Sequence, residues 1–382
     1  MVDFAKAGLL DGLAGAERAA RERLLEQLAG DGFSLAELKA AVAEDRLALL
    51  PVERVLGGPH SARDVERETG TPAELVLRIR RLVGLPEAAP DDPVFSEEDI
   101  TAARSTRMFL DAGFDERAIG EISRVLGEGM GRVTATITVA FTQAFLQAGD
   151  SEEDVAGRFA ALAEQLTPAF APVLVATFKA HLREAVSSGV IGRAQREAGG
   201  AAGAQEVAVC FADLVGFTRL GGQIEIEELG GVAGRFGELA NEVVRPPVRL
   251  VKTIGDAAMF VSPEFAPLVE TALSLIEAVE RADLPALRAG IAFGTAAQRA
   301  GDYFGHSVNL ASRVTGAARP GSVLCTRDVR DGAADKFEWS SAGRFRLKGL
   351  HEPEPLYRAR RLEAAKTPKS DRRRKRAASS AE

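Results

Sequence analysis

The chain has 382 residues, of which 46% are hydrophobic and 27% charged, and its formal net charge is −7. These values are typical of a globular protein and exclude a collagen-like, intrinsically disordered or disulfide-stapled chain. The length favours two domains over one. The two cysteines, Cys210 and Cys325, lie in apolar runs and are interpreted as small core residues of a protein in a reducing cytoplasm.

Residues 1–190 are predicted to form an all-helical domain. Segments 33–45, 96–113 and 150–166 each carry a Ser or Asp cap at the start, an acidic first turn and apolar residues spaced by three to four. The stretch 133–149 contains threonines and glutamines and is short for a membrane span, so it is predicted to be a buried helix. The N-terminus lacks the apolar core of a signal peptide, and we expect a cytoplasmic protein without membrane insertion.

A Gly/Ala-rich stretch, 191–204, is interpreted as a linker to a second domain at 205–362, where strand-like runs alternate with helical ones. Strands are expected at 207–215, 248–262 (two strands joined by a tight turn), 287–294 and 322–326, with helices at 225–244, 263–282 and 307–318. The order βαββαβ predicts a ferredoxin-like α+β fold, with an antiparallel sheet and helices on one face. The basic tail, 363–382, is predicted to be disordered and solvated.

Two carboxylates of the second domain call for a chemical explanation. Asp213 lies inside an apolar strand, where an unpaired carboxylate costs on the order of several kcal/mol. Asp256 lies at the turn of the following hairpin, and the two carboxylates meet if that hairpin lies beside the first strand. They then repel each other unless cations hold them. Oxygen ligands favour Mg²⁺ or Mn²⁺ over zinc, although Asp256 taken alone could also be an ordinary turn residue.

A second group of polar residues follows. Asn309 and Arg313 are four residues apart and therefore share one face of a predicted helix. An arginine there could stabilise the charge of a transferring phosphoryl group, but a solvated helix face explains the pair as well. Lys252 lies in an apolar strand, and it could instead be an edge-strand lysine that discourages aggregation. Asp302 follows a glycine and could be a turn or capping residue.

Together the stretches FADLVGFT (211–218), VKTIGD (251–256) and GDYFGHSVNLASR (301–313) resemble the catalytic domain of the class III adenylate/guanylate cyclases, over about residues 205–362. The resemblance implies that Asp213 and Asp256 hold two Mg²⁺ or Mn²⁺ ions per active site.

The same resemblance implies the reaction and the substrate. Asn309 would orient the ribose and Arg313 would stabilise the transition state, as the ribose 3′-hydroxyl attacks the α-phosphate and pyrophosphate leaves. Lys252 and Asp302 occupy the positions that read adenine, which implies ATP as substrate and 3′,5′-cyclic AMP as product. Because the family builds each site from two protomers and this chain carries all six residues, a homodimer with two equivalent shared sites is expected.

The helical half, placed before the catalytic domain, resembles in layout the actinobacterial cyclases whose N-terminal domain senses pH and inhibits catalysis. His181, in the helix leading to the linker, is the candidate titrating group because histidine changes charge near neutrality. An ordinary surface histidine is the alternative. A further alternative is that the apolar helices bind a lipid or another small hydrophobe.

Two other functions remain open at this point. One is a catalytically silent nucleotide-binding module, although neither metal-binding aspartate is lost. The other is a DNA-binding regulator with a cyclase-like nucleotide-sensing domain. It depends on segment 61–86, which is similar to a helix-turn-helix with an Arg-rich second helix. A helical regulatory bundle is favoured over it, and nucleic acid is not expected as a partner, because the N-terminal half shows no broad basic surface.

Overall fold

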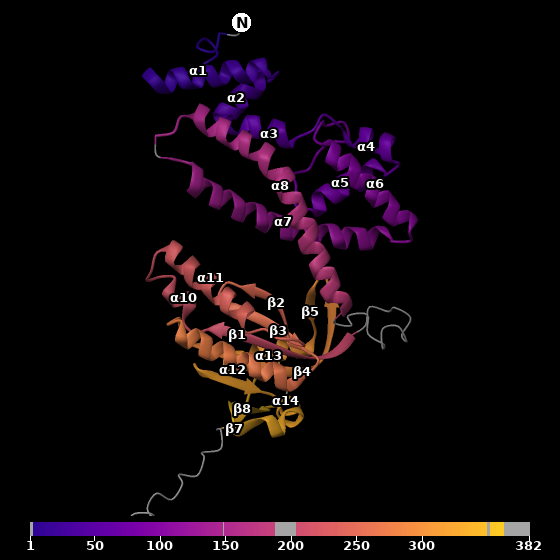
Figure 1. Ribbon diagram of the computed structural model, residues 1–382, viewed down its shortest axis with the longest axis vertical. Helices are drawn as coiled ribbons and strands as arrows, with labels where there is room; N and C mark the ends of the chain where they lie inside the picture. The colour runs from indigo at the N-terminus through magenta and orange to yellow at the C-terminus, as the bar shows by residue number, and fades with distance from the viewer. Residues whose placement is uncertain (1–2, 148, 188–203, 350–351, 363–382) are drawn as a thin grey trace, which may run out of the picture. The chain divides into compact units, whose positions relative to one another are not determined.

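The computed structural model describes residues 3–147, 149–187, 204–349 and 352–362 (Figure 1). Contacts divide the chain into two compact units, Met1–Ser187 and Ser188–Glu382, which we call the helical unit and the sheet unit. The predicted linker, apart from its last residue, and the predicted basic tail lie outside the described residues.

The helical unit confirms the all-helical prediction for its described part. Four of its helices begin with a capping box, in which a serine hydroxyl accepts a backbone N–H and a carboxylate three residues later accepts the N–H of that serine. The serines are Ser34, Ser61, Ser96 and Ser151. The α-helices are α1 (Gly15–Gly30), α2 (Leu35–Ala43), α3 (Leu50–Leu56), α4 (Ala62–Thr69), α5 (Ala73–Leu82), α6 (Glu97–Asp111), α7 (Glu116–Phe145) and α8 (Glu152–Ser187), with a short 3₁₀ turn at Leu47–Leu49.

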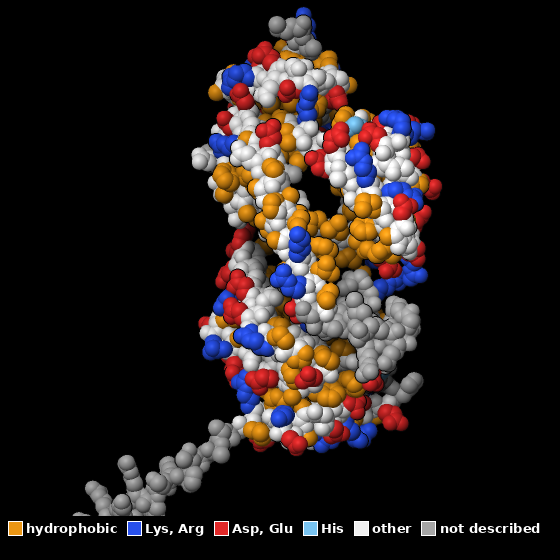
Figure 2. Space-filling view, turned by 45° about the vertical axis from the view of Figure 1, so that its right-hand side comes forward, with side chains coloured by type: hydrophobic (Ala, Val, Ile, Leu, Met, Phe, Trp, Pro, Cys, Tyr) orange, Lys and Arg blue, Asp and Glu red, His pale blue; other side chains and the backbone are white. Residues whose placement is uncertain are grey.

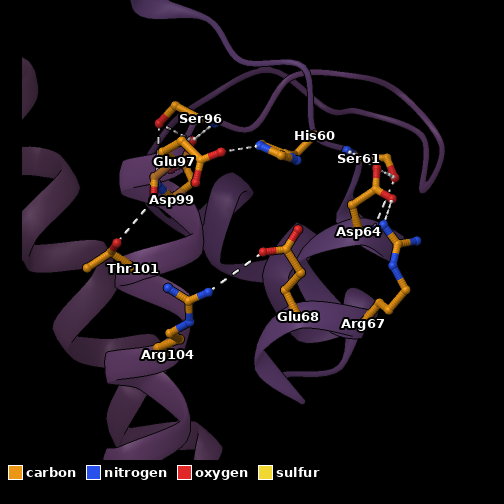
Figure 3. A network of polar contacts seen from close by, with 10 residues as sticks. All are labelled: His60, Ser61, Asp64, Arg67, Glu68, Ser96, Glu97, Asp99, Thr101 and Arg104. Carbon is orange, nitrogen blue, oxygen red and sulfur yellow. Dashed lines mark hydrogen bonds and ion pairs between the residues drawn. The ribbon is translucent and has the colours of Figure 1, made fainter.

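A polar network joins α4 to α6 (Figure 3). The Nε2 atom of His60 lies 2.8 Å from Oε1 of Glu97, at the start of α6. The backbone of His60 pairs with that of Phe95 in an isolated bridge. Arg104 of α6 forms an ion pair with Glu68 of α4, with 3.6 Å between nitrogen and oxygen. A small apolar core that includes Phe95 lies beneath these contacts, so this part of the unit is held by both packing and polar bonds.

The prediction of a buried helix at 133–149 is wrong in part. The segment is helical as far as Phe145, the last residue of α7, but most of its side chains are exposed, including Val139 at 57%. Phe141 is buried. Further apolar side chains are exposed on α8, among them Phe178 at 66%, and hydrophobic side chains cover much of the visible surface of this unit (Figure 2).

Within the described part of the chain, no single helix combines the length and apolarity that crossing a bilayer requires. The segments 152–166 and 168–186, bent by 44° relative to each other, meet that criterion only when they are taken together.

The sheet unit is built around one mixed sheet with the strand order β2-β3-β1-β4-β6-β8-β7, and β5 pairs with β4. The first four strands follow the ferredoxin-like order, which confirms the predicted fold. The strands are β1 (Ala204–Leu214), β2 (Arg249–Ile254), β3 (Ala257–Ser262), β4 (Leu287–Arg299), β5 (Asp302–Phe304), β6 (Ser322–Cys325), β7 (Phe337–Phe345) and β8 (Glu354–Arg361). The helices are α10 (Phe217–Leu220), α11 (Ile226–Glu242), α12 (Phe265–Arg281), α13 (His306–Ala317) and α14 (Arg327–Gly332), with a 3₁₀ turn at Ala334–Lys336.

Two details of the predicted sheet are corrected. Strands β4 and β6 pair in parallel, and helices cover both faces. Side chains of β1 alternate between the faces: Ala208 and Cys210 pack with α11 and α12, whereas Val207 and Val209 pack with α13. A parallel pair needs a crossover connection, and α13 supplies it on the face opposite to α11 and α12.

Both cysteines are buried, as predicted. Cys210 lies on β1 and Cys325 on β6, and each is fully excluded from solvent. Burial raises the pKa of both thiols far above the ordinary value, so neither is a reactive thiolate at neutral pH.

Candidate functional site

The sheet brings Asp213 and Asp256 together. Asp213 is the second-last residue of β1, and its cross-strand neighbour on β3 is Ala257, the residue after Asp256. The N–H of Leu214 donates to the carbonyl of Asp256 at 3.0 Å, which holds the β2–β3 turn against the end of β1. Burial raises the pKa of Asp256, and the charge of Asp213 raises it further. The predicted carboxylate pair is therefore present.

Sequence reasoning missed Arg288, which lies directly opposite Asp213 on β4. Its Nε and Nη2 atoms donate to Oδ2 of Asp213 at 3.0 and 2.6 Å, and its Nη1 donates to the carbonyl of Gly316 at 3.3 Å. The charge of Asp213 is therefore balanced by a guanidinium within the chain itself. A lone arginine in the apolar run 287–294 was the available signal, because a strand charge in such a run needs a partner.

The residues present fit a divalent cation. Asp213 and Asp256 are both only half-buried, and they offer hard oxygen ligands from two adjacent strands and a turn. Burial and the charge of Asp213 raise the pKa of Asp256, and a positive charge beside the two carboxylates would offset their mutual repulsion. Mg²⁺ in such sites is commonly bound by one or two carboxylates together with substrate phosphates. In the described residues no group of three or more His, Cys, Asp or Glu side chains is arranged to hold a metal.

The second predicted pair is also assembled. Lys252 on the edge strand β2 forms an ion pair with Oδ2 of Asp302 on β5, and the two side chains are 33% and 28% exposed. The other carboxylate oxygen of Asp302 accepts the N–H of Tyr303 at 2.8 Å, which fixes the plane of the carboxylate. An ammonium donor thus lies beside a carboxylate acceptor at a partly open position.

Asn309 and Arg313 lie on α13, as predicted. Asn309 is exposed and Arg313 is half-buried. The guanidinium of Arg313 lies close to Gly349, where a Cβ atom would be 3.2 Å from both Nη1 and Nη2. Gly349 has a φ of +78°, a conformation that also favours glycine. This glycine therefore leaves room for the arginine.

Within the described part of the chain, the three pairs make no direct contact with one another. Among the described residues, no hydrogen bond or ion pair links the carboxylate pair, the Lys252–Asp302 pair and the Asn309–Arg313 pair. His181 lies exposed on α8, in the helical unit. Segment 61–86 forms two short helices, α4 and α5, which are separated by Gly70 in the left-handed conformation.

Comparison with known proteins accounts for both units. Residues 2–186 match the family described as "Adenylate cyclase regulatory domain", and residues 201–358 match the "Adenylate and Guanylate cyclase catalytic domain". A pH-sensitive adenylate cyclase of Mycobacterium tuberculosis is 40% identical over 363 residues, which are 92% of this chain and 91% of that protein. An adenylate cyclase of Streptomyces griseus is 31% identical over 309 residues, 78% of this chain and 76% of that protein.

The fold and the matched catalytic domain define the sheet unit as the catalytic domain of a class III nucleotide cyclase, and thus as an enzyme domain. Taken whole, the chain belongs to the adenylate cyclases of this class that carry an N-terminal regulatory domain. The crystal structure of the adenylyl cyclase CyaB from P. aeruginosa also matches, with a TM-score of 0.37 at 21% identity, covering 42% of this chain and 96% of that one. The helices α4 and α5, on which the DNA-binding alternative depended, lie within the matched regulatory domain.

Proposed function

We propose that this enzyme converts ATP to 3′,5′-cyclic AMP and pyrophosphate at sites shared across a homodimer, under control of the helical unit. The observation that carries the proposal is the Lys252–Asp302 pair. Adenine presents a hydrogen-bond acceptor at N1 and a donor at its N6 amine. An ammonium next to a carboxylate matches that pattern, whereas guanine, with a donor at N1 and an acceptor at O6, reverses it.

The remaining residues take their roles from their chemistry. Asp213 and Asp256 would hold two Mg²⁺ or Mn²⁺ ions, which when bound would lower the proton affinity of the ribose 3′-hydroxyl and neutralise the triphosphate. Asn309 orients the ribose. The 3′-oxygen gives up its proton to water and forms a bond to the α-phosphorus, while the bond from that phosphorus to the bridging oxygen breaks and pyrophosphate leaves. Arg313 donates to the phosphoryl oxygens as their charge grows.

Two features support sites shared between protomers. The three pairs lack mutual contacts within the described part of one chain. Exposed apolar side chains also flank them: Ile254, two residues before Asp256, is 60% exposed, and Phe304, two residues after Asp302, is 55% exposed. Large apolar side chains beside a polar site favour burial by a partner. A second copy of the chain would cover them while completing each site.

Regulation by pH is proposed from the relative named pH-sensitive, whose match covers the helical unit as well as the sheet unit. His181 is the proposed titrating group, because it lies near the end of the helix that precedes the predicted linker. The domain boundaries 1–190, 191–204, 205–362 and 363–382 and a cytoplasmic location remain part of this proposal.

The test incubates the full-length protein with Mn²⁺ and either ATP or GTP and identifies the cyclic product by mass spectrometry. Cyclic AMP from ATP is expected, with little product from GTP. Asp213→Ala and Arg313→Ala variants should each be inactive and should regain activity when they are mixed, because one of the two sites of the mixed dimer is intact. A cyclic product formed from GTP but not from ATP would contradict ATP as the substrate. A mixture that recovers no activity would contradict the shared site.

A further inference from the structure

Helix α13, which carries Asn309 and Arg313, is fastened to the sheet near both of its ends by side-chain hydroxyls. Near its start, the Oγ of Ser307, a fully buried side chain, donates to the carbonyl of Thr295 on β4 at 3.2 Å. Near its end, the Oγ1 of Thr315, 4% exposed, lies 2.8 Å from the carbonyl oxygen of Ala311 in its own helix and 3.1 Å from that of Phe211 on β1, so its single proton is shared between the two acceptors. The Ser307 bond and the Phe211 contact of Thr315 run to strand backbone, so each ties the helix to the sheet.

The sheet is shaped to receive the helix at these points. A Cβ atom on Gly290 of β4 would lie 2.1 Å from the backbone nitrogen of Thr315 and 2.6 Å from its Oγ1. A Cβ atom on Gly305, the residue before α13, would lie 2.7 Å from the carbonyl oxygen of Thr295. The backbone of α13 and the residue before it therefore lies directly against the backbone of β4 at both ends of the helix, and any side chain at these glycines would push the helix away.

The end of the helix is also tied to the carboxylate pair. Arg288 donates through Nη1 to the carbonyl of Gly316 on α13 and through its other nitrogens to Asp213. Phe211, whose carbonyl oxygen lies 3.1 Å from the Thr315 hydroxyl, lies two residues before Asp213 on the same strand. These contacts fix the position and rotation of α13 relative to β1, the strand that carries Asp213.

We propose that Ser307 and Thr315 are positioning residues that set where Asn309 and Arg313 meet the reacting phosphate. Asn309 lies two residues after the first hydroxyl and Arg313 two residues before the second, so a shift at either end moves both side chains. This inference rests on the proposed function, because it assigns the reaction to Asn309 and Arg313.

The kinetic consequence is specific. Displacement of a catalytic group by about 1 Å can lower the rate by up to roughly 100-fold. An interaction made mainly in the transition state is lost from kcat, whereas KM follows ground-state binding. Lys252 and Asp302 lie on β2 and β5 and pair with each other, so the ion pair that is proposed to read the base contains no residue of α13.

Thr315→Val tests the proposal, because it replaces the hydroxyl by a methyl group of similar shape. We expect kcat to fall by about 10-fold or more while KM for ATP stays within about two-fold. Thr315→Ser keeps the hydroxyl and should restore most of the activity. The matched control is Thr271→Val on α12, where a buried hydroxyl (5% exposed) donates only within its own helix, to Pro267 at 2.9 Å. It should leave both constants unchanged.

Mixing experiments show which part of the site the variant damages. Thr315→Val combined with Asp213→Ala should recover activity. One site of the mixed dimer then combines unmutated carboxylates from one protomer with an unmutated α13 from the other. Thr315→Val combined with Arg313→Ala should not recover, since both defects lie on α13. Recovery in the second mixture and not in the first would place the damage on the carboxylate side and overturn the proposal.

An unchanged kcat in Thr315→Val, or an equal loss in Thr271→Val, would also overturn it. Should Thr315→Val fail to fold, Ser307→Ala applies the same test at the other end of the helix, with the same expected fall in kcat. The proposed function fails separately: it is refuted if the wild-type enzyme makes no cyclic AMP or if Arg313→Ala keeps full activity.

Discussion

Replacing Arg288 by methionine should destabilise the sheet unit when no divalent cation is bound. The change keeps much of the side-chain length but leaves Asp213 without its counter-charge, beside a second carboxylate at Asp256. Breaking a fully buried ion pair costs about 3–5 kcal/mol, whereas a surface pair contributes about 0–1 kcal/mol. The Arg288 and Asp213 side chains are 30% and 26% exposed, so the expected loss is about 1–2 kcal/mol.

The sequence provides a local probe for this measurement. The only tryptophan, Trp339, lies on β7, and its Nε1 donates to the carbonyl of Ala333 at 3.3 Å. Tryptophan fluorescence of the full-length protein therefore reports unfolding of the sheet unit. Denaturant curves would be recorded in a chelator and again with Mg²⁺ or Mn²⁺. The loss should be present in the chelator and shrink with metal, because carboxylates freed from Arg288 bind the cation more tightly.

Arg361→Met is the matched control. Arg361 of β8 pairs with Glu270 and Glu277 of α12, and its side chain is 37% exposed, similar to that of Arg288. Its removal should cost stability to the same extent with and without metal. If Arg288→Met loses the same free energy in both media, or loses none, Arg288 is not the counter-ion of a metal-binding carboxylate pair.

Three further predictions follow from the site. Lys252→Glu combined with Asp302→Cys should lower kcat/KM for ATP by at least about 100-fold and favour GTP, which product analysis checks; a retained ATP preference contradicts the base-reading role. Because burial raises the pKa of Asp256 above its ordinary 3.8, the folded protein binds that proton more tightly, and metal-free stability should fall as pH rises from 3.8 through the raised value. Asp256→Asn should abolish this fall in denaturant curves, and a variant with the same pH dependence as the wild type would refute it. His181→Ala should flatten the pH–activity profile of the full-length enzyme, and an unchanged profile removes His181 from the pH response.

Much of the site was predictable from local sequence. The apolar run around Asp213 predicted a buried strand, and the tight turn at Asp256 predicted a hairpin; both are present. The four-residue spacing of Asn309 and Arg313 placed them on one helix, which is α13. These features depend on side-chain periodicity and turn chemistry over a few residues, and such information is complete within a short segment.

The tertiary structure alone decided the contacts between distant segments. Arg288 lies 75 residues from Asp213, and only the β1–β4 register makes them neighbours. The parallel pairing of β4 with β6 sends α13 to the second face of the sheet, where Thr315 reaches Phe211 from 104 residues away. No local pattern encodes such pairings, because strand register and helix placement are set by packing of the whole domain. The sequence by itself pointed to the residues that are proposed to carry the chemistry, whereas the fold decided what holds them in place.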